Sequence, residues 1–324
     1  MENVNRGISE RFAQLFKDSA LYQLYQKHQN ELFLGVRSKY INLYYNCDSI
    51  SKVKMDRGGD RLICEINPYY LGTSTAESKT VKLTPEEVVE HYDAILAKSR
   101  EKARNSNEKK AQQQLAMRNN SNLNSNWFCV DLEYCKASHQ GRFDIIAVSK
   151  AHPHRVALIE LKYSSGAISG KSGIVKHVAD FSEYYHSPHY ENLKNEIIDV
   201  VKSMKMLGVS VPKEIQSLST SNFTQSPEYF FITLNNNALD KYGSTPKQSM
   251  AAYLFKEGTL NYVEWGCKRP STKCIESEYG DITKKSNKNM CATFLFSTEK
   301  YPHILIDDII DGRYTERILP QRTL

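Results

Sequence analysis

The sequence has no hydrophobic run long enough to cross a membrane, and its first residues do not look like a secretory signal. The longest apolar runs, VALIEL and HILIDDII, fall far short of the roughly 18 residues that a membrane span requires. The opening stretch MENVNRGISERFAQLF has no basic start, unbroken apolar block or small-residue cleavage site. These absences predict a soluble, cytoplasmic protein.

Signals for structural zinc and for disulfide bonds are also missing. The seven cysteines are scattered along the chain without a C-x-x-C pair, and their odd number favours reduced thiols. The pairs His152-x-His154 and His186-x-x-His189 do not lie beside cysteines or carboxylates at a zinc spacing. We therefore expect neither a zinc module nor a disulfide framework.

Size and charge leave room for a large core and for a polyanionic partner. A chain of 324 residues, 40% of them hydrophobic, can bury the core of one large domain or of two. The formal net charge of +6 suits a nucleic acid without requiring one. Basic residues are frequent between Lys98 and Arg118, where they form either a solvated helix face or a track for a phosphate backbone.

The first third of the chain has the pattern of a small α+β module followed by a helix. Residues 9–29 show helical periodicity, and residues 32–70 resemble two or three short strands joined by tight turns. Thr84 and Pro85 then begin a helix that should run to about residue 104. The polar stretch that follows is either a solvated helix extension or a linker.

Beyond residue 126 the pattern is β-β-β-α-α-β. Short polar connections separate the first three strands, so they should form an antiparallel meander. The predicted strands are 127–134, 142–150, 155–163 and 228–236, and the predicted helices are 174–185 and 191–207. Two more strands are expected at 290–298 and 303–310.

The candidate site lies on the second and third of these strands. Side chains alternate along a strand, so Glu160 and Lys162 in IELKY must share one face. Asp144 precedes an apolar run on the neighbouring strand and can approach Glu160 if the two strands pair. Two converging carboxylates favour a divalent cation, Mg²⁺ or Mn²⁺, and Lys162 could orient a water on that ion.

The E-x-K spacing is weak by itself. It is expected about once by chance in a chain of this length, and the sequence contains three copies. The copies at Glu77 and Glu108 lie in polar stretches, whereas Glu160 ends a hydrophobic strand. A purely structural ion pair is the alternative interpretation of Glu160 and Lys162.

At these residues the sequence resembles the PD-(D/E)xK nuclease superfamily over roughly residues 127–236. The resemblance implies a mixed α/β (α+β) fold with a restriction-endonuclease-like core, in which helices flank a central mixed sheet. It also implies that Asp144 is the aspartate of the second core strand and that Glu160 and Lys162 are the E-x-K of the third. Such enzymes use Mg²⁺ to cut DNA, less often RNA. The corresponding domains are residues 1–80 as a recognition or regulatory module, 81–126 as helix and linker, and 127–324 as the nuclease-like domain.

The sequence departs from the superfamily pattern at three points. Phe143 replaces the proline before the aspartate. His177 stands near the position of a helical glutamine found in some branches, where it could contact a phosphate or the metal-bound water. The further acidic metal ligand is open: Glu133 on the first strand is one candidate, and Glu87 or Glu90 on the preceding helix are the others.

The stretch ELKYSSGAISGKSG also has to be compared with a phosphate-binding loop. The pattern G-x-x-x-x-G-K-[ST] places its first glycine at residue 165, which is Ser165, and Gly166 lies one position late. Asp307 could end the magnesium-holding strand of such an NTPase, but it lies far downstream. In a nuclease, Lys171 and Ser172 would instead contact a substrate phosphate.

The sequence therefore favours a Mg²⁺-dependent DNA endonuclease of host (antiviral) defence or DNA processing. One alternative is a protein that binds nucleic acid or a partner without catalysis, and another is a P-loop-like NTPase. A homodimer or a partner subunit is compatible with the sequence, which shows no surface for either.

Overall fold

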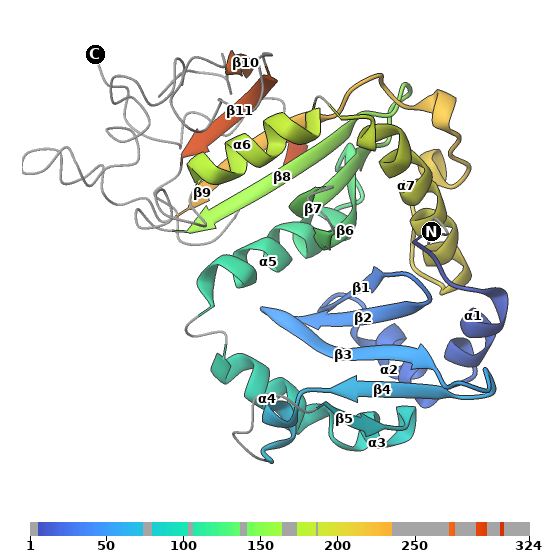
Figure 1. Cartoon of the computed structure of the whole chain (residues 1–324). Coiled ribbons are helices and arrows are strands. Elements are labelled where there is room, and N and C mark those ends of the chain that lie inside the picture. Colours follow the sequence, from blue (N-terminus) through green and yellow to red (C-terminus); the bar gives the residue numbers. More distant parts are fainter. Residues whose placement is uncertain are drawn as a thin grey trace, which may run out of the picture. The chain divides into compact units, whose positions relative to one another are not determined.

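The computed structural model describes residues 6–73, 80–102, 106–136, 141–163, 174–185, 187–234, 272–275, 290–296 and 305–307. The chain divides into two compact units. The first unit comprises Met1–Met117 and Leu193–Ser221, and the second comprises Arg118–Asn192 and Asn222–Leu324. Each unit contains helices and one β-sheet of the described residues, so the fold is mixed α+β (Figure 1). Within these residues, no helix is long and apolar enough to span a bilayer.

The first unit begins with two short helices where the sequence predicts one. Helix α1 spans Glu10–Lys17 and α2 spans Ala20–His28. Ser19 separates them because its backbone is extended, with ψ of 156°. The Ser19 hydroxyl donates to the Phe16 carbonyl over 2.7 Å, which uses one of the carbonyls left at the end of α1. The predicted single helix is therefore wrong at this turn.

An antiparallel sheet follows the two helices. Its strands are β1 (Leu32–Val36), β2 (Tyr40–Tyr45), β3 (Asp48–Met55), β4 (Leu62–Ile66) and β5 (Val81–Leu83), paired in that order. Four strands thus lie in residues 32–70, where the sequence predicts two or three. Helix α2 lies behind this sheet in the view of Figure 1. The face that carries Ile41, Leu43, Val53 and Cys64 is buried, as expected for an antiparallel sheet with one face in a core.

Three helices and a 3-10 turn complete this part of the chain. They are the 3-10 helix at Pro68–Leu71, α3 (Pro85–Glu90), α4 (Tyr92–Lys102) and α5 (Asn107–Ser121). The predicted start at Thr84 is confirmed by a capping box, in which the Glu87 carboxylate accepts from the Thr84 N–H over 2.6 Å. The helix ends at Glu90 and not near residue 104. Helix α5 is a packed helix and not a linker, since Leu115 is fully buried.

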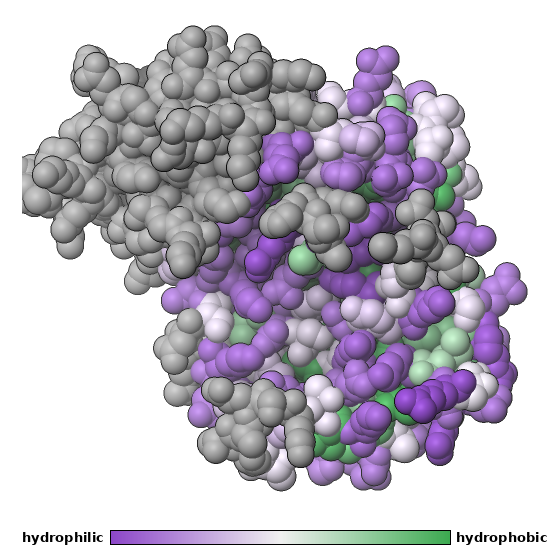
Figure 2. All heavy atoms as spheres, in the orientation of Figure 1, coloured by the Kyte–Doolittle hydropathy of each residue, from purple (hydrophilic) through white to green (hydrophobic). Residues whose placement is uncertain are grey.

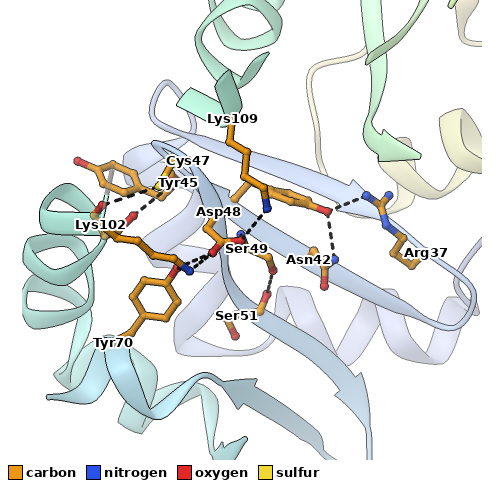
Figure 3. Close-up of polar contacts among 12 residues, drawn as sticks. Arg37, Asn42, Tyr45, Cys47, Asp48, Ser49, Ser51, Tyr70, Lys102 and Lys109 are labelled. Carbon is orange, nitrogen blue, oxygen red and sulfur yellow. Dashed lines mark hydrogen bonds and ion pairs between the residues drawn. The ribbon is translucent and has the colours of Figure 1, made fainter. Parts of the chain in front are cut away.

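A polar cluster joins α4 and α5 to the β2–β3 turn in the first unit (Figure 3). The Asp48 carboxylate accepts from the Tyr70 hydroxyl over 2.9 Å and from the Lys102 ammonium, and Lys109 Nζ lies 3.8 Å from it. Burial acts to raise the pKa of Asp48, but the Lys102 hydrogen bond and the Lys109 and Lys102 charges outweigh it and lower that pKa. Part of the basic run of residues 98–118 therefore has a structural role.

The second unit contains the predicted meander. Strands β6 (Trp127–Cys135), β7 (Arg142–Ser149) and β8 (Val156–Tyr163) pair antiparallel in sequence order, which confirms that prediction. Helix α6 (Ile174–Tyr185) follows in this unit. Helix α7 (His189–Met206) and the short 3-10 turns at Lys213–Ile215 and Thr220–Asn222 come next along the chain and lie mostly within the Leu193–Ser221 segment of the first unit. Strand β9 (Glu228–Leu234) belongs again to the second unit. The described sheet has the order β10-β11-β9-β8-β7-β6, with β10 at Thr272–Ile275 and β11 at Met290–Phe296. Because β9 pairs parallel to β8, the sheet is mixed.

The prediction of a strand at residues 303–310 is wrong for the part of this range that the structure describes. Ile306 and Asp307 are helical, and the residues on either side of 305–307 lie outside the described part. Asp307 is buried and accepts hydrogen bonds from the Asn126 N–H over 2.8 Å and from the Ser125 hydroxyl. These contacts hold the start of β6, so Asp307 does not end a magnesium-holding strand.

Helix α6 packs on the mixed sheet through aromatic side chains. The Phe181 ring lies 4.9 Å from Phe231 and 5.5 Å from Tyr229, measured between ring centroids. Phe143 lies 5.0 Å from both Phe181 and Tyr184. Edge-to-face and tilted pairs of this kind stabilise beyond the area they bury. They fix the helix that carries His177 on β7, which carries Asp144, and on β9; β8, which carries Glu160, lies between these two strands in the sheet.

Candidate functional site

Strand β8 holds a buried ion pair at its carboxyl end. Lys162 Nζ lies 2.6 Å from Glu160 Oε1, and only 6% and 2% of these two side chains is exposed. The two residues share a strand face, as the sequence predicts. Transferring two charged groups from water into the protein interior costs free energy, so such groups stay ionised only when they are paired and hydrogen-bonded.

Asp144 on β7 is bound to the backbone of the same stretch of β8. The described β7–β8 register ends at the pair Ile145–Ile159. Two residues farther along β8, the Leu161 N–H donates to Asp144 Oδ2 over 2.8 Å. In a regular antiparallel ladder a main-chain carbonyl would accept a bond of this kind. The Asp144 carboxylate is therefore placed beside the peptide that separates Glu160 from Lys162.

His177 on α6 completes a group of three around one oxygen atom. Its Nε2 lies 3.0 Å from Glu160 Oε1, which Lys162 also contacts, and 12% of the His177 side chain is exposed. An ionised carboxylate can only accept hydrogen bonds, so this contact needs a proton on Nε2. The structure thus joins the predicted residues Glu160, Lys162 and His177 at one oxygen atom, and the predicted Asp144 is bound to the adjacent Leu161 N–H.

Glu133 occupies an unusual backbone conformation on β6. Its φ of 51° lies in the left-handed region, which costs a residue other than glycine about 1–2 kcal/mol. The pairs Leu132–Ile145 and Tyr134–Phe143 flank it, so its register position is across from Asp144. Glu133, Asp144 and Glu160 therefore lie on three consecutive strands. Backbone strain of this kind is frequent near functional sites.

The oxygen-bearing side chains of the site provide some of the ligands that a hard divalent cation needs. In the described part of the chain, no group of three His, Cys, Asp or Glu side chains is arranged to hold a metal ion. Asp144 and Glu160 nevertheless flank one peptide, at Leu161. Mg²⁺ retains several waters and is usually bound by one or two carboxylates together with substrate phosphates. A Mg²⁺ ion at this point would therefore rest on Asp144 and Glu160 and take its other ligands from water and substrate.

The remaining predicted residues either lie outside the described part of the chain or belong to the first unit. Lys171 and Ser172 lie outside the described residues. Glu87 caps α3, and both Glu87 and Glu90 belong to the first unit.

Sequence reasoning missed two contributions to the site. The Leu161 N–H holds the Asp144 carboxylate, and Phe181 anchors the helix that carries His177. Helical periodicity marks Phe181 as a core residue, but it does not say which strands that residue packs on. A backbone donor leaves no mark in the sequence at all.

Comparison with known proteins finds no family model, curated protein or solved structure that matches this chain. A mixed α+β fold hosts many different activities and does not identify a function. The function is therefore inferred from the residues of the site.

Proposed function

We propose that this protein is a metal-dependent nuclease that hydrolyses phosphodiester bonds of nucleic acid, with DNA as substrate and Mg²⁺ or Mn²⁺ as cofactor. The supporting observation is the buried Glu160 carboxylate between Lys162 and His177, with Asp144 bound to the Leu161 N–H. A structural ion pair requires only Glu160 and Lys162. The additional carboxylate and imidazole at the same point are the groups that phosphodiester hydrolysis uses.

Asp144 and Glu160 would hold the ion. The N–H and C=O of one strand residue point to the same neighbouring strand, so the Leu161 carbonyl, on the side of the N–H that Asp144 accepts from, would supply a neutral oxygen ligand. When bound, the ion would polarise a phosphodiester oxygen and lower the pKa of a coordinated water. Glu133, across from Asp144 in the register, is the proposed additional acid.

The remaining chemistry belongs to Lys162 and His177. The Lys162 ammonium lies where it can offset negative charge that develops on the phosphate in the transition state. His177 Nε2 holds a proton against Glu160 and can exchange it with a water or a leaving oxygen, a contribution typically of about 10²–10⁴-fold in rate. Both groups are fixed by packing, so little reorganisation is needed when substrate binds.

The proposed setting is a cytoplasmic DNA endonuclease of host defence or DNA processing, acting alone, as a homodimer or with a partner subunit. Lys171 and Ser172, in the loop after β8, are the proposed contacts to a substrate phosphate. The positive net charge of +6 suits this substrate.

The test is cleavage of supercoiled plasmid, single-stranded DNA and RNA by the full chain in Mg²⁺, Mn²⁺ or EDTA. We expect metal-dependent cutting that Glu160→Ala and Lys162→Ala each abolish. Glu101→Ala is the matched control, because it removes an exposed carboxylate that is also paired with a lysine, at 2.9 Å. Cutting that survives both site substitutions would contradict the assignment of the site.

A non-catalytic nucleic-acid-binding protein is the second candidate. It is favoured by one observation: Glu160 is 2% exposed and already contacts both Lys162 and His177, as a structural network would be. A folded wild type that binds nucleic acid but never cuts it, with any of the metals, would support this candidate. An NTPase would instead hydrolyse nucleotide and lose that activity in Lys171→Ala.

A further inference from the structure

The face of the first sheet that is opposite its buried face has an unusual composition. The register aligns Tyr40 of β2 with Lys54 of β3, and aligns Lys52 of β3 with Glu65 of β4 and Glu65 with Lys82 of β5. Residues directly opposite in a ladder, and residues two apart on a strand, point to the same face. These five residues therefore form one surface, which we call the basic sheet face.

The basic sheet face carries three lysines and one carboxylate. Lys52 Nζ lies 3.4 Å from Glu65 Oε2, Lys54 Nζ contacts Glu65 Oε1, and Lys82 is the strand neighbour of Glu65. Burial acts to raise the pKa of Glu65, but the surrounding Lys54 and Lys52 outweigh it and lower that pKa. Glu65 is thus ionised at neutral pH, and the five residues carry two positive charges in excess.

This surface is open to solvent and includes an aromatic ring. The Lys52 and Lys54 side chains are 39% and 35% exposed, and Lys82 is exposed. Lys52 Nζ lies 4.5 Å from the centroid of the half-buried Tyr40 ring. Helix α2 lies behind the sheet in Figure 1, and in the same orientation Figure 2 shows many hydrophilic residues, with some hydrophobic ones between them, on the surface of the first unit. Toward β1 the same face is closed, since Tyr44 is buried.

We propose that the basic sheet face binds a single strand of nucleic acid. Lys52 and Lys54 are two residues apart on one strand, so they point the same way about 6.8 Å apart and can pair with successive phosphates. Tyr40 offers a ring on which an unstacked base can lie, and only an unpaired strand presents such bases. A duplex would contact the lysines but leave the ring unused.

This inference goes beyond cleavage, because it concerns a surface in the first unit and holds whether or not the second unit cuts. It gives the proposed nuclease a second contact to its substrate. The competing explanation is that these lysines only keep a solvated sheet face, and the edge strand β5, from pairing with other chains. In that case the surface has no affinity for a nucleic-acid strand.

The test is fluorescence anisotropy with labelled oligo(dT), oligo(U) and a short DNA duplex, in EDTA so that nothing is cut. The test variant is Lys52→Gln/Lys54→Gln, which keeps most of each side chain. Each phosphate contact on a single strand contributes about fivefold to affinity at 0.1 M salt, so losing two contacts weakens binding about 25-fold. The slope of log affinity against log salt should fall by about 1.4. The two single strands separate a DNA ligand from an RNA ligand.

The matched control is Lys17→Gln/Lys27→Gln, which makes the same charge change at exposed lysines of α1 and α2. It should leave affinity unchanged. Glu65→Gln tests the opposite change, because removing the one carboxylate of the basic sheet face should tighten binding. This test does not depend on whether the Lys52→Gln/Lys54→Gln variant folds well. Tyr40→Ala should weaken binding of the single strands more than Tyr40→Phe does, and circular dichroism checks the fold of each variant.

Three results would overturn the proposal: equal losses in the test and control pairs, no tightening in Glu65→Gln, or duplex bound as tightly as the single strands. Binding and cleavage are separated by design. A wild type that binds through the basic sheet face but never cuts contradicts only the nuclease. A wild type that cuts nucleic acid, together with a Lys52→Gln/Lys54→Gln variant that binds as tightly as the wild type, contradicts only the proposed role of the basic sheet face.

Discussion

The Glu160 side chain is buried in β8, where an ionised carboxylate without partners would destabilise the fold. Its charge is tolerated because Lys162 lies 2.6 Å away and His177 lies 3.0 Å away. The same oxygen accepts both contacts, so the three side chains depend on one another. A substitution at one of them changes the environment of the other two, and activity alone cannot separate a lost catalytic group from a lost partner.

Stability measurements can make that separation. We expect Glu160→Ala to lower the free energy of unfolding by about 3–5 kcal/mol, because it leaves the Lys162 ammonium buried without its carboxylate. The double variant Glu160→Gln/Lys162→Met should recover most of that loss, since it buries no unpaired charge. Urea denaturation measures both. If the site is catalytic, the double variant stays inactive although it is stable, whereas recovered cleavage would contradict the proposed roles.

The left-handed backbone at Glu133 gives a second prediction at the scale of one residue. Glu133→Gly should raise the free energy of unfolding by about 1 kcal/mol, because glycine adopts a φ of 51° without the steric cost of a Cβ atom. Glu133→Ala is the control, since it removes the carboxylate but keeps the Cβ. Equal stabilities of the two variants in urea would show that the conformation is not strained. Both variants should cut less if Glu133 is the additional acid.

At the scale of elements, α6 delivers His177 to the site, and Phe181 fixes α6 on the sheet. We expect Phe181→Ala to lower the free energy of unfolding by about 3–5 kcal/mol through the cavity that it leaves. Phe181→Leu should lose less, because it fills most of the space. Tyr185→Ala, on the same helix but 37% exposed, is the control and should cost little. A small effect of Phe181→Ala would mean that other contacts hold the helix.

The strands and helices of residues 127–234 follow from the sequence because their apolar residues recur with clear periods. The order β6-β7-β8-α6-α7-β9 and the shared face of Glu160 and Lys162 were predictable for that reason. For α5 the sequence left a solvated helix or a linker open, and the packing of this helix could not be predicted because its sequence is polar. Asn119 is buried there because its side chain donates to the Trp127 carbonyl over 2.8 Å and accepts from the Ser125 hydroxyl. Specific tertiary hydrogen bonds of this kind leave no hydrophobic period.

The site shows the same limit. A shared strand face could be read from the alternation of side chains, and the proximity of Asp144 followed from the pairing of its strand. That the Asp144 carboxylate accepts from the Leu161 N–H could not be foreseen, and neither could the left-handed conformation of Glu133. Both arise where regular pairing of the strands is interrupted, and local patterns describe only regular pairing.

At the scale of the whole molecule, the chain leaves the first unit and returns to it. Leu193–Ser221 belongs to the first unit, although the sequence gives no reason to separate it from the residues before it. Ser203 on α7 accepts a hydrogen bond from the Ile8 N–H over 3.2 Å and donates to the Asp199 carbonyl over 2.7 Å. A continuous helical pattern cannot show that one helix begins in one compact unit and ends in another.

The described part of the first unit also contains three carboxylates with lowered pKa values, at Asp48, Asp56 and Glu65. A carboxylate whose pKa is lower in the folded state stabilises that state above its unfolded pKa, about 3.9 for Asp and 4.3 for Glu. The stabilisation is lost as the pH falls through the folded pKa. The first unit should therefore become easier to unfold as the pH drops from about 5 toward 3 and below.

Asp48→Asn tests this pH dependence in urea denaturation between neutral and acidic pH. Asparagine cannot pair with the Lys102 and Lys109 ammonium groups, so the variant should be less stable than the wild type at pH 7. The difference should shrink as the pH falls, because protonation removes the same interactions from the wild type. Asp60→Asn, at a carboxylate whose side chain is 85% exposed, should keep the wild-type pH dependence. A constant difference between Asp48→Asn and the wild type at every pH would mean that Asp48 stabilises the turn by packing and not by charge.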